Sequence, residues 1–493
     1  MRIRRAAAAP AGSRTSFDLR LIVACPGCQA PMTLEEGATA VACPGCNKQF
    51  LSLPRTHPLE VVVAPILDTG DALHRARSFL RAGKHRATWV ARGRWRLLPY
   101  WRYRTKAFQW VEGLRHGPRD SAASFHDLEV RNFDLLIPAT EAASNDLLPR
   151  PGIFTAYPLA PEVIAGASPT PVTLPFSVAQ VRARSEVEVR TDLGGPRIVH
   201  RHLALVGEQM LLVHLPFFSL SYHFHDERHE VLVDGILGEV TTHRVPPGEP
   251  EPVATEPPGP SPKSLFLPLL CPACAESLRL SSDDLIHPCL CCGRAWEVTE
   301  QGLEEVSHRL AVTGGTGPDA RYLPFWVIGV QVAGFFPLEQ AARSDHSEKR
   351  LAVYVPAFES WQIDKLSHLG VRLTRSLPDY DTEEPGGSAR TAGESHDELT
   401  LGGATLGRAD AERFAWVILG ALASANANTF SQFMKQGSMS TENAELHWLP
   451  FRPSGLYLHD PVSGAMVRNM PSPGEPPTDP PSTTSDRAPR RAA

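Results

Sequence analysis

Eight of the nine cysteines fall into four C-x-x-C pairs, and these pairs form two groups that lie far apart in the chain. In the first group 14 residues (29–42) separate the two pairs, and in the second group 14 residues (275–288) again separate them. A C-x-x-C turn directs two thiolates at one cation, and two such turns complete the tetrahedral four-sulfur shell that Zn²⁺ favours. The spacing therefore predicts two metal sites.

This spacing resembles the zinc ribbon family over residues 21–54 and 265–300. A closed four-cysteine shell leaves no position for water, so each zinc is expected to be structural. An iron centre of the rubredoxin type and redox disulfides are the alternatives. The ninth cysteine, Cys291, is expected to be a bystander rather than a redox-sensitive thiol. The resemblance implies two zinc ions, one held by Cys25, Cys28, Cys43 and Cys46, and the other by Cys271, Cys274, Cys289 and Cys292.

One shift of 246 residues carries the first cysteine group onto the second, from Cys25 onto Cys271 to Cys46 onto Cys292. Other landmarks recur in the same order, with offsets that drift as loop lengths change. They are the L-P-aromatic-W segments 98–101 and 323–326, the P-A pairs 138–139 and 356–357, the L-P-F segments 215–217 and 449–451, and the D-x-x-x-G segments 234–238 and 460–464. This order predicts an internal duplication.

The predicted fold class is α+β and β-rich: two tandem copies of a zinc ribbon followed by a mostly antiparallel β body with a few helices. Eight prolines between Pro246 and Pro262 mark a spacer between the copies. The predicted boundaries are a flexible basic arm (1–20), a first zinc ribbon (21–54), a first body (55–240), a proline-rich linker (241–264), a second zinc ribbon (265–300), a second body (301–470) and a disordered proline-rich tail (471–493).

Hydrophobic periodicity predicts the elements of the bodies. In 216–224, alternating aromatic and polar residues indicate a half-buried strand that turns into a second strand at 231–240. Apolar residues at helical spacing predict helices over 71–83 and 410–423, and another that begins at 177–183.

A basic stretch between Arg75 and Lys106 contains 11 Lys or Arg residues and no acid, with Trp and Tyr interleaved. Such a stretch could bind phosphates while its rings stack on unpaired bases. The net charge of the whole chain is −5, so the protein is not a bulk polyanion binder. A solvated basic face, or one neutralised by the protein's own acidic residues, is the alternative. The candidate nucleic-acid contacts are Arg92, Arg94, Arg96, Arg102, Arg104 and Lys106.

Signatures of common enzyme classes are missing from the sequence, which has no G-x-S-x-G, Walker A or H-E-x-x-H motif. The predicted function is a non-catalytic zinc-ribbon scaffold that presents surfaces to a protein partner. Nucleic-acid binding is the alternative, and an enzyme with an unrecognised site comes third. No membrane span is expected, and reduced thiols without a secretory signal favour the cytoplasm. Loss of Cys25 and Cys28 is expected to loosen the first half alone.

Overall fold

The computed structural model describes most of the chain between residues 17 and 468. Of the predicted arm, residues 17–20 begin a strand and the rest lies outside the described residues, as do the tail and all of the linker except residues 241–244. No helix among the described residues has the length and apolarity needed to cross a bilayer. The described residues are 17–52, 59–82, 89–90, 93–116, 122–140, 152–158, 167–191, 197–224, 227–244, 266–299, 302–312, 319–335, 349–358, 363–376, 378, 380–383 and 400–468.

The first half is built on an eleven-stranded sheet with the central order β10-β7-β11-β5-β9-β1-β2. Helices α1 (Thr69–Ala82) and α2 (Phe176–Thr191) pack on it, and β3 (Ala40–Ala42) and β4 (Gln49–Ser52) complete the first ribbon. The strands of the sheet are β1 (Phe17–Ala24), β2 (Pro31–Glu35), β5 (Glu60–Val63), β6 (Trp89–Val90), β7 (Arg94–His116), β8 (Ala122–Pro138), β9 (Gly152–Pro158), β10 (Ser168–Pro169), β11 (Arg197–Phe224), β12 (Glu227–Asp234) and β13 (Val240–Arg244).

The second half is built on an eight-stranded sheet with the central order β20-β19-β23-β18-β21. Its helices are α3 (Ile363–Ser376), α4 (Arg408–Ala423) and α5 (Ala427–Gln436). Four further strands belong to the second ribbon: β14 (Phe266–Pro268), β15 (Ile286–Pro288), β16 (Ala295–Thr299) and β17 (Gly302–Val306). The sheet consists of β18 (His308–Val312), β19 (Arg321–Ala333), β20 (Lys349–Pro356), β21 (Asp381–Glu383), β22 (Thr400–Leu401), β23 (Ser438–Ser454), β24 (Tyr457–His459) and β25 (Met466–Arg468).

The two sheets share their pairing pattern and register. Leu98 of β7 lies opposite Leu215 of β11, and Leu323 of β19 lies opposite Leu449 of β23. In each half the central strand also pairs in parallel with a short strand, β5 or β18. Antiparallel pairs dominate both sheets, so the described part of the chain is the strand-rich α+β structure that was predicted.

A tryptophan forms the same hydrogen bond in each half. The Nε1 of Trp101 donates to the carbonyl of Leu174 at 2.8 Å, and the Nε1 of Trp326 donates to the carbonyl of Leu406 at 2.8 Å. Each carbonyl belongs to the segment that leads into a long helix, α2 or α4. The L-P-aromatic-W landmarks of the sequence therefore occupy equivalent positions in the two sheets.

Residues 216–222 are buried on both faces of their strand, whereas the alternation over 216–224 predicted a half-buried strand. Phe217 belongs to the core beneath the first ribbon, and Phe218 belongs to the core beneath α1. Even Ser219 is buried, because its hydroxyl donates to the carboxylate of Glu230 on β12. The polar side chain of Ser219 therefore has a hydrogen-bond partner inside the protein instead of water.

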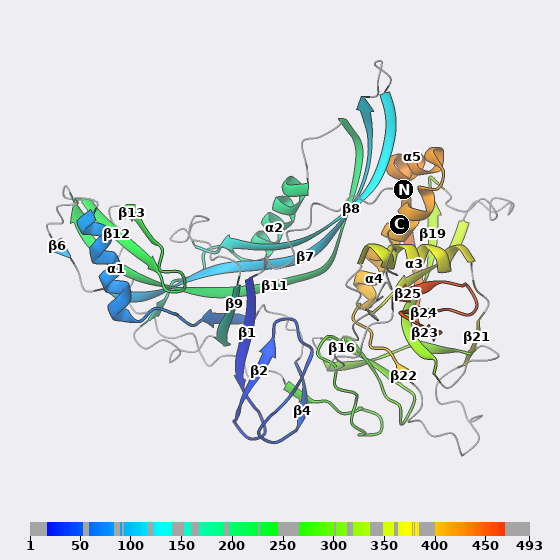
Figure 1. Cartoon of the computed structure of the whole chain (residues 1–493), viewed down its shortest axis with the longest axis horizontal. Helices are drawn as coiled ribbons and strands as arrows, with labels where there is room; N and C mark the ends of the chain where they lie inside the picture. Colours follow the sequence, from blue (N-terminus) through cyan, green and yellow to red (C-terminus); the bar gives the residue numbers. More distant parts are fainter. Residues whose placement is uncertain are drawn as a thin grey trace, which may run out of the picture.

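Strands β7, β8 and β11 extend beyond the first half as a curved arm that reaches the second half (Figure 1). At its distal end Phe108 packs edge-on against Phe414 of α4, with ring centroids 4.9 Å apart. The Nε1 of Trp110 donates to the carbonyl of Val417 at 3.2 Å. A Cβ at Gly420 would lie only 2.3 Å from that nitrogen, so this glycine lets the helix approach the arm.

We expect His202 of β11 to make this junction sensitive to acid. Its ring lies 4.9 Å from that of Trp416, and burial lowers its pKa from 6.5 to about 4. The unfolded chain takes up a proton as the pH falls below 6.5, but the folded chain does so only near 4. The free energy of unfolding should therefore fall over that window, by about 2 kcal/mol after allowance for solvent screening.

Denaturant titrations at a series of pH values test this expectation. The His202→Phe variant should lack this contribution to the pH dependence, since Phe keeps the ring contacts and has no proton to gain. His74→Phe on the exposed surface of α1 is the control and should follow the parent protein. An equal slope in His202→Phe and the parent between pH 6.5 and 4 would count against the assignment.

Candidate metal centres

Two groups of four thiols converge, one in each half of the chain. Within each group the four Sγ atoms all lie within 4.8 Å of one another. In the first group the Sγ atoms of Cys25 and Cys46 are 3.8 Å apart, and those of Cys28 and Cys43 are 3.6 Å apart. A tetrahedral shell with Zn–S bonds of about 2.3 Å requires sulfur–sulfur separations of about 3.8 Å.

The second group has the same geometry. The Sγ atoms of Cys271 and Cys292 are 3.6 Å apart, and those of Cys274 and Cys289 are 3.5 Å apart. In both groups the first cysteine of each pair is buried, so the ligand set closes against the protein core. Within the part of the chain that the structure describes, these are the two groups of His, Cys, Asp and Glu side chains able to hold a metal ion.

The backbone of each C-x-x-C turn is a tight loop that presents N–H groups to sulfur. The amide of Gly27 donates to the Sγ of Cys25, and the amide of Gly45 donates to the Sγ of Cys43, both at 3.3 Å. Each turn then closes through a residue with positive φ, which permits the reversal that brings both thiolates to one side. These residues are Gln29 (62°), Asn47 (56°), Ala275 (60°) and Gly293 (71°).

The thiols of a group do not ionise alike. Burial raises the pKa of Cys271, but the amides of Cys274 and Ala273 and the nearby thiols outweigh it and lower the pKa to about 6. Burial, together with contacts to the thiols of Cys274 and Cys292, outweighs the nearby backbone amides and raises the pKa of Cys289 to about 12. The lowered pKa of Cys271 favours its thiolate, and cation binding must displace protons from the other thiols, so affinity should fall in acid.

Cys291 occupies the position that glycine has in the first group. The shift of 246 aligns it with Gly45, where a Cβ would lie 2.9 Å from the Cβ of Ala30 and 3.4 Å from the Sγ of Cys28. Cys291 is exposed, and its contact with Cys274 raises its pKa. A raised pKa disfavours the reactive thiolate, which agrees with a bystander role.

The cysteine groups are not tandem in the chain, since residues 47–270 separate them, yet the two ribbons lie side by side (Figure 1). Strand β14, which leads into the second group, pairs with β4 of the first ribbon. The Thr39 amide donates to the carbonyl of Ser282 at 2.7 Å, and its Oγ1 donates to the carbonyl of Asp284 at 2.5 Å. The ribbons share one core of Ala40, Leu51, Leu269, Cys271, Leu278, Cys289, Trp296 and Val298.

This shared core changes one expectation. We now expect loss of the first metal site to reach beyond the first half, because Ala40 and Leu51 of the first ribbon pack in the same cluster as Cys271 and Cys289. The linker that precedes β14 also does not keep the two cysteine groups apart. Linear spacing concealed this contact, since a proline-rich segment does not show where the strand that follows it will pair.

The D-x-x-x-G segments repeat the backbone of the cysteine turns without sulfur. The Asp234 amide donates to the carbonyl of Glu239 and the Gly238 amide donates to the carbonyl of Asp234, as the amides of Cys25 and Gln29 do in the first turn. The Asp234 carboxylate accepts from the Ile236 amide at 2.7 Å, in place of a thiolate. Segment 460–464 is built alike. In each segment the residue with positive φ, Gly238 or Gly464, comes four positions after the Asp, as Gln29 comes four positions after Cys25. This equal spacing is the feature of the sequence that indicates the likeness.

The structure uses much of the predicted basic stretch internally. Arg92 lies outside the described residues, and Arg94 lies at the start of β7. Arg96 is buried and pairs with Glu230 at 2.7 Å. Arg104 is 35% exposed and lies 3.9 Å from the carboxylate of Glu36. The interleaved rings are also in the core, since the side chains of Trp95, Tyr100, Trp101 and Tyr103 are all buried.

Arg102 is the centre of a buried ion cluster that joins the first ribbon to the arm. Its Nε and Nη2 donate to the two carboxylate oxygens of Asp134 on β8 at 2.8 and 2.7 Å. Its Nη1 donates to Glu36, which follows β2. Burial raises the pKa of the Glu36 carboxyl, and Arg102 opposes that shift. The sequence showed the arginine but not these two acids, which are distant in the chain.

The Arg102→Met variant tests this cluster. Methionine fills similar space but removes the guanidinium from two half-buried carboxylates and leaves Glu36 only the more distant Arg104, so the free energy of unfolding should fall by about 3 kcal/mol. Arg104→Met, on the exposed neighbour, should cost less than about 1 kcal/mol. Both values come from urea unfolding at pH 7. Equal losses for the two variants would contradict the central role of Arg102.

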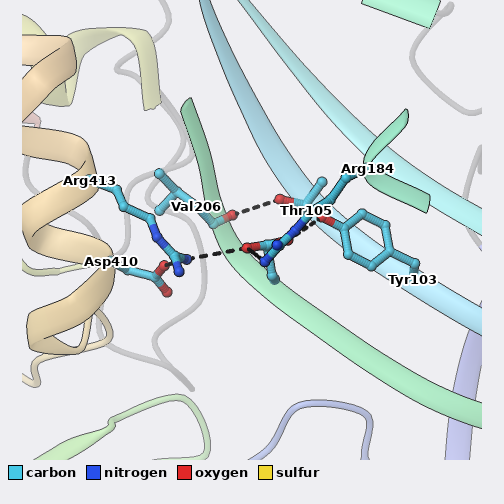
Figure 2. A network of polar contacts seen from close by, with 7 residues as sticks. Tyr103, Thr105, Arg184, Val206, Asp410 and Arg413 are labelled. Carbon is cyan, nitrogen blue, oxygen red and sulfur yellow. Dashed lines mark hydrogen bonds and ion pairs between the residues drawn. The ribbon is translucent and has the colours of Figure 1, made fainter. Parts of the chain in front are cut away.

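A second polar network joins the first half to α4 (Figure 2). The Glu208 carboxylate accepts from the Nε and Nη2 of Arg184 on α2, at 2.7 and 2.9 Å. It also accepts from the Tyr103 hydroxyl at 2.5 Å and from the Nη1 of Arg413 at 3.3 Å. The Nη1 of Arg413 also donates to Asp410. Burial raises the pKa of Glu208, but these donors outweigh it and lower the pKa.

No protein-family model, no curated protein and no solved structure matches this chain. The likeness to zinc ribbons therefore rests on the cysteine spacing and on the geometry of the two thiol groups.

Proposed function

We propose that this protein is a non-catalytic zinc-ribbon protein whose two structural zinc ions stabilise surfaces that bind a protein partner. The observation that carries the proposal is the pair of converging thiol groups, each with Sγ atoms within 4.8 Å and with two of its cysteines buried. A four-thiolate shell has no open coordination position, so its metal contributes folding energy rather than chemistry. Metal-binding thiols must remain reduced, which favours the cytoplasm as the compartment.

We infer that the two halves arose by duplication of one ribbon-plus-body module. The equal offset of the cysteines, the equal register of Leu98–Leu215 and Leu323–Leu449, and the repeated tryptophan hydrogen bonds support this inference. A duplicated scaffold provides two similar surfaces that can diverge separately. The function of each half need not be the same.

Exposed apolar side chains of the second ribbon are our candidates for contact with a protein partner. Three leucines that are exposed lie within it: Leu270, Leu280 and Leu290. Exposed leucines on a small metal-stabilised unit support contact with an apolar partner surface, since large apolar side chains in water favour burial.

Cross-linking in the source cells, followed by mass spectrometry, tests the proposal. Replacing the three leucines with serine should remove cross-links between the second ribbon and other proteins, while zinc content stays at two per chain. A control variant with Ile66→Ser and Leu456→Ser changes exposed apolar residues elsewhere and should keep those cross-links. Unchanged cross-links in the triple variant, or a parent protein without cross-linked partners, would refute the proposal.

Nucleic-acid binding by residues 75–106 is the alternative function. With the buried Arg96 and Arg102 both paired to acids, it would depend on less buried residues such as Arg104 and Lys106. Under this alternative, affinity for single-stranded DNA or RNA should fall steeply with salt and should drop in the Arg104→Ala, Lys106→Ala double variant. No binding at low salt would reject it.

A further inference from the structure

Helix α2 lies on the side of the arm away from the ribbons and the second half (Figure 1). Side chains alternate along β7, so Tyr100 and Trp110 point to one face and Trp101 and Tyr103 to the other. The first face packs against the first ribbon and α4, and the second face packs against α2. Ala179, Ala183 and Val187 of α2 are buried there.

The outer side of α2 carries an exposed valine stripe. Val178, Val181 and Val189 are 51, 64 and 68% exposed. Together with Ser185, the three valines are spaced three, four and four residues apart along the chain. This spacing places all four residues on one side of a helix. No packing in the described part of the chain accounts for valines at these positions, because the opposite side of α2 contacts the arm.

The equivalent side of α4 is covered. Both helices have 16 residues, and a shift of 232 (176 to 408) carries the buried Ala179 and Ala183 onto the buried Ala411 and Ala415. The same shift carries Val181 onto Arg413, which contacts Glu208 of the arm, and Ser185 onto Val417, which accepts a hydrogen bond from Trp110. Among the described residues, the side that forms an interface in the second half is therefore exposed and more apolar in the first.

Charges around Ser185 are arranged so that α2 complements itself. Arg182 and Arg184 precede this serine, and Glu186 and Glu188 follow it. Arg184 already pairs with Glu208 of the arm, and Glu186 also contacts Arg190 of its own helix. In an antiparallel pair of such helices, the exposed Arg182 of one copy lies near Glu186 of the other, so opposite charges meet across the contact. A parallel pair would put like charges together.

We propose that α2 packs antiparallel against α2 of a second copy of this chain, about a two-fold axis at Ser185. Val181 of each copy then lies against Val189 of the other, and Arg182 of each lies near Glu186 of the other. Such a contact is self-complementary and closes as a dimer. Serine at the centre lets the helices approach closely. An interface of this kind buries about 1,000 Å², at the small end of the range for specific protein interfaces. We therefore expect the dimer to dissociate in the micromolar range.

Sedimentation velocity of the full, zinc-loaded chain over a range of micromolar concentrations tests the proposal. The parent protein should shift from monomer to dimer with rising concentration. Val181→Glu should raise the dissociation constant at least tenfold, because it buries a charge at the contact. Val199→Glu, at an exposed position on β11, is the matched control and should dimerise like the parent. A parent protein that stays monomeric throughout, or a Val181→Glu variant that dimerises as well as the parent, would overturn the proposal.

A charge exchange tests the antiparallel arrangement. Glu186→Arg alone and Arg182→Glu alone each place like charges together, so both should weaken self-association. Mixing the two variants restores two opposite pairs, and a heterodimer should form more tightly than either homodimer. Zinc content and circular dichroism should match the parent in both variants. No preference for the heterodimer would refute this register.

Discussion

Replacing Cys25 and Cys28 with serine should lower the zinc content from two ions per chain to one and should destabilise both ribbons. Two of four thiolates are lost, and the remaining pair cannot hold zinc with comparable affinity. A small ribbon depends on its metal for folding, so its strands should open. Because β4 pairs with β14 and the two ribbons share a core, the second site loses support as well.

Elemental analysis and hydrogen exchange measure this outcome. Backbone amides of residues 266–299 should exchange faster in the double variant than in the parent, even though their own cysteines are intact. Cys291→Ser, which changes the exposed thiol outside the predicted ligand set, should keep two zinc ions and normal exchange. If exchange rose in the first ribbon only, the shared core would not couple the two sites.

Trp110→Ala should release the arm from α4. The side chain is 1% exposed, packs against Phe430 at a centroid distance of 5.5 Å, and donates to the carbonyl of Val417. Its removal leaves a large cavity between a sheet and two helices that cannot collapse easily. We expect a loss of about 4 to 5 kcal/mol in the free energy of unfolding of the junction.

Urea unfolding and small-angle scattering distinguish two ways in which this loss can appear. A separate, earlier transition with a larger radius of gyration means that the halves part before they unfold. A lower midpoint for one cooperative transition means that the junction is part of a single core. Val199→Ala, at an exposed position on β11, should change neither measurement. A Trp110→Ala protein as stable as the parent would show that the arm does not depend on this contact.

Local patterns in the sequence predicted much of the first level of organisation. The strand-rich α+β class, the helices near 71–83 and 410–423, and the convergence of the four cysteines in each group all follow from relations within short segments. A C-x-x-C turn has one compact geometry, and a helix has one period, so the residues that define them can be recognised without knowing the rest of the chain.

The tertiary structure alone decided which surfaces meet. The basic stretch appeared as a ladder for phosphates, but Arg102 faces Glu36 and Asp134, two acids that come from other segments of the sheet. The sequence placed the two cysteine groups in separate copies with a proline-rich spacer between the copies, but β14 of the second ribbon pairs with β4 of the first. Such contacts join segments that are far apart in the chain. The spacing of neighbouring residues does not show which distant segments will pack together. The sequence therefore determined the units and their ligands, whereas the fold determined that the ribbons share a core and that the arm of one half covers a helix of the other.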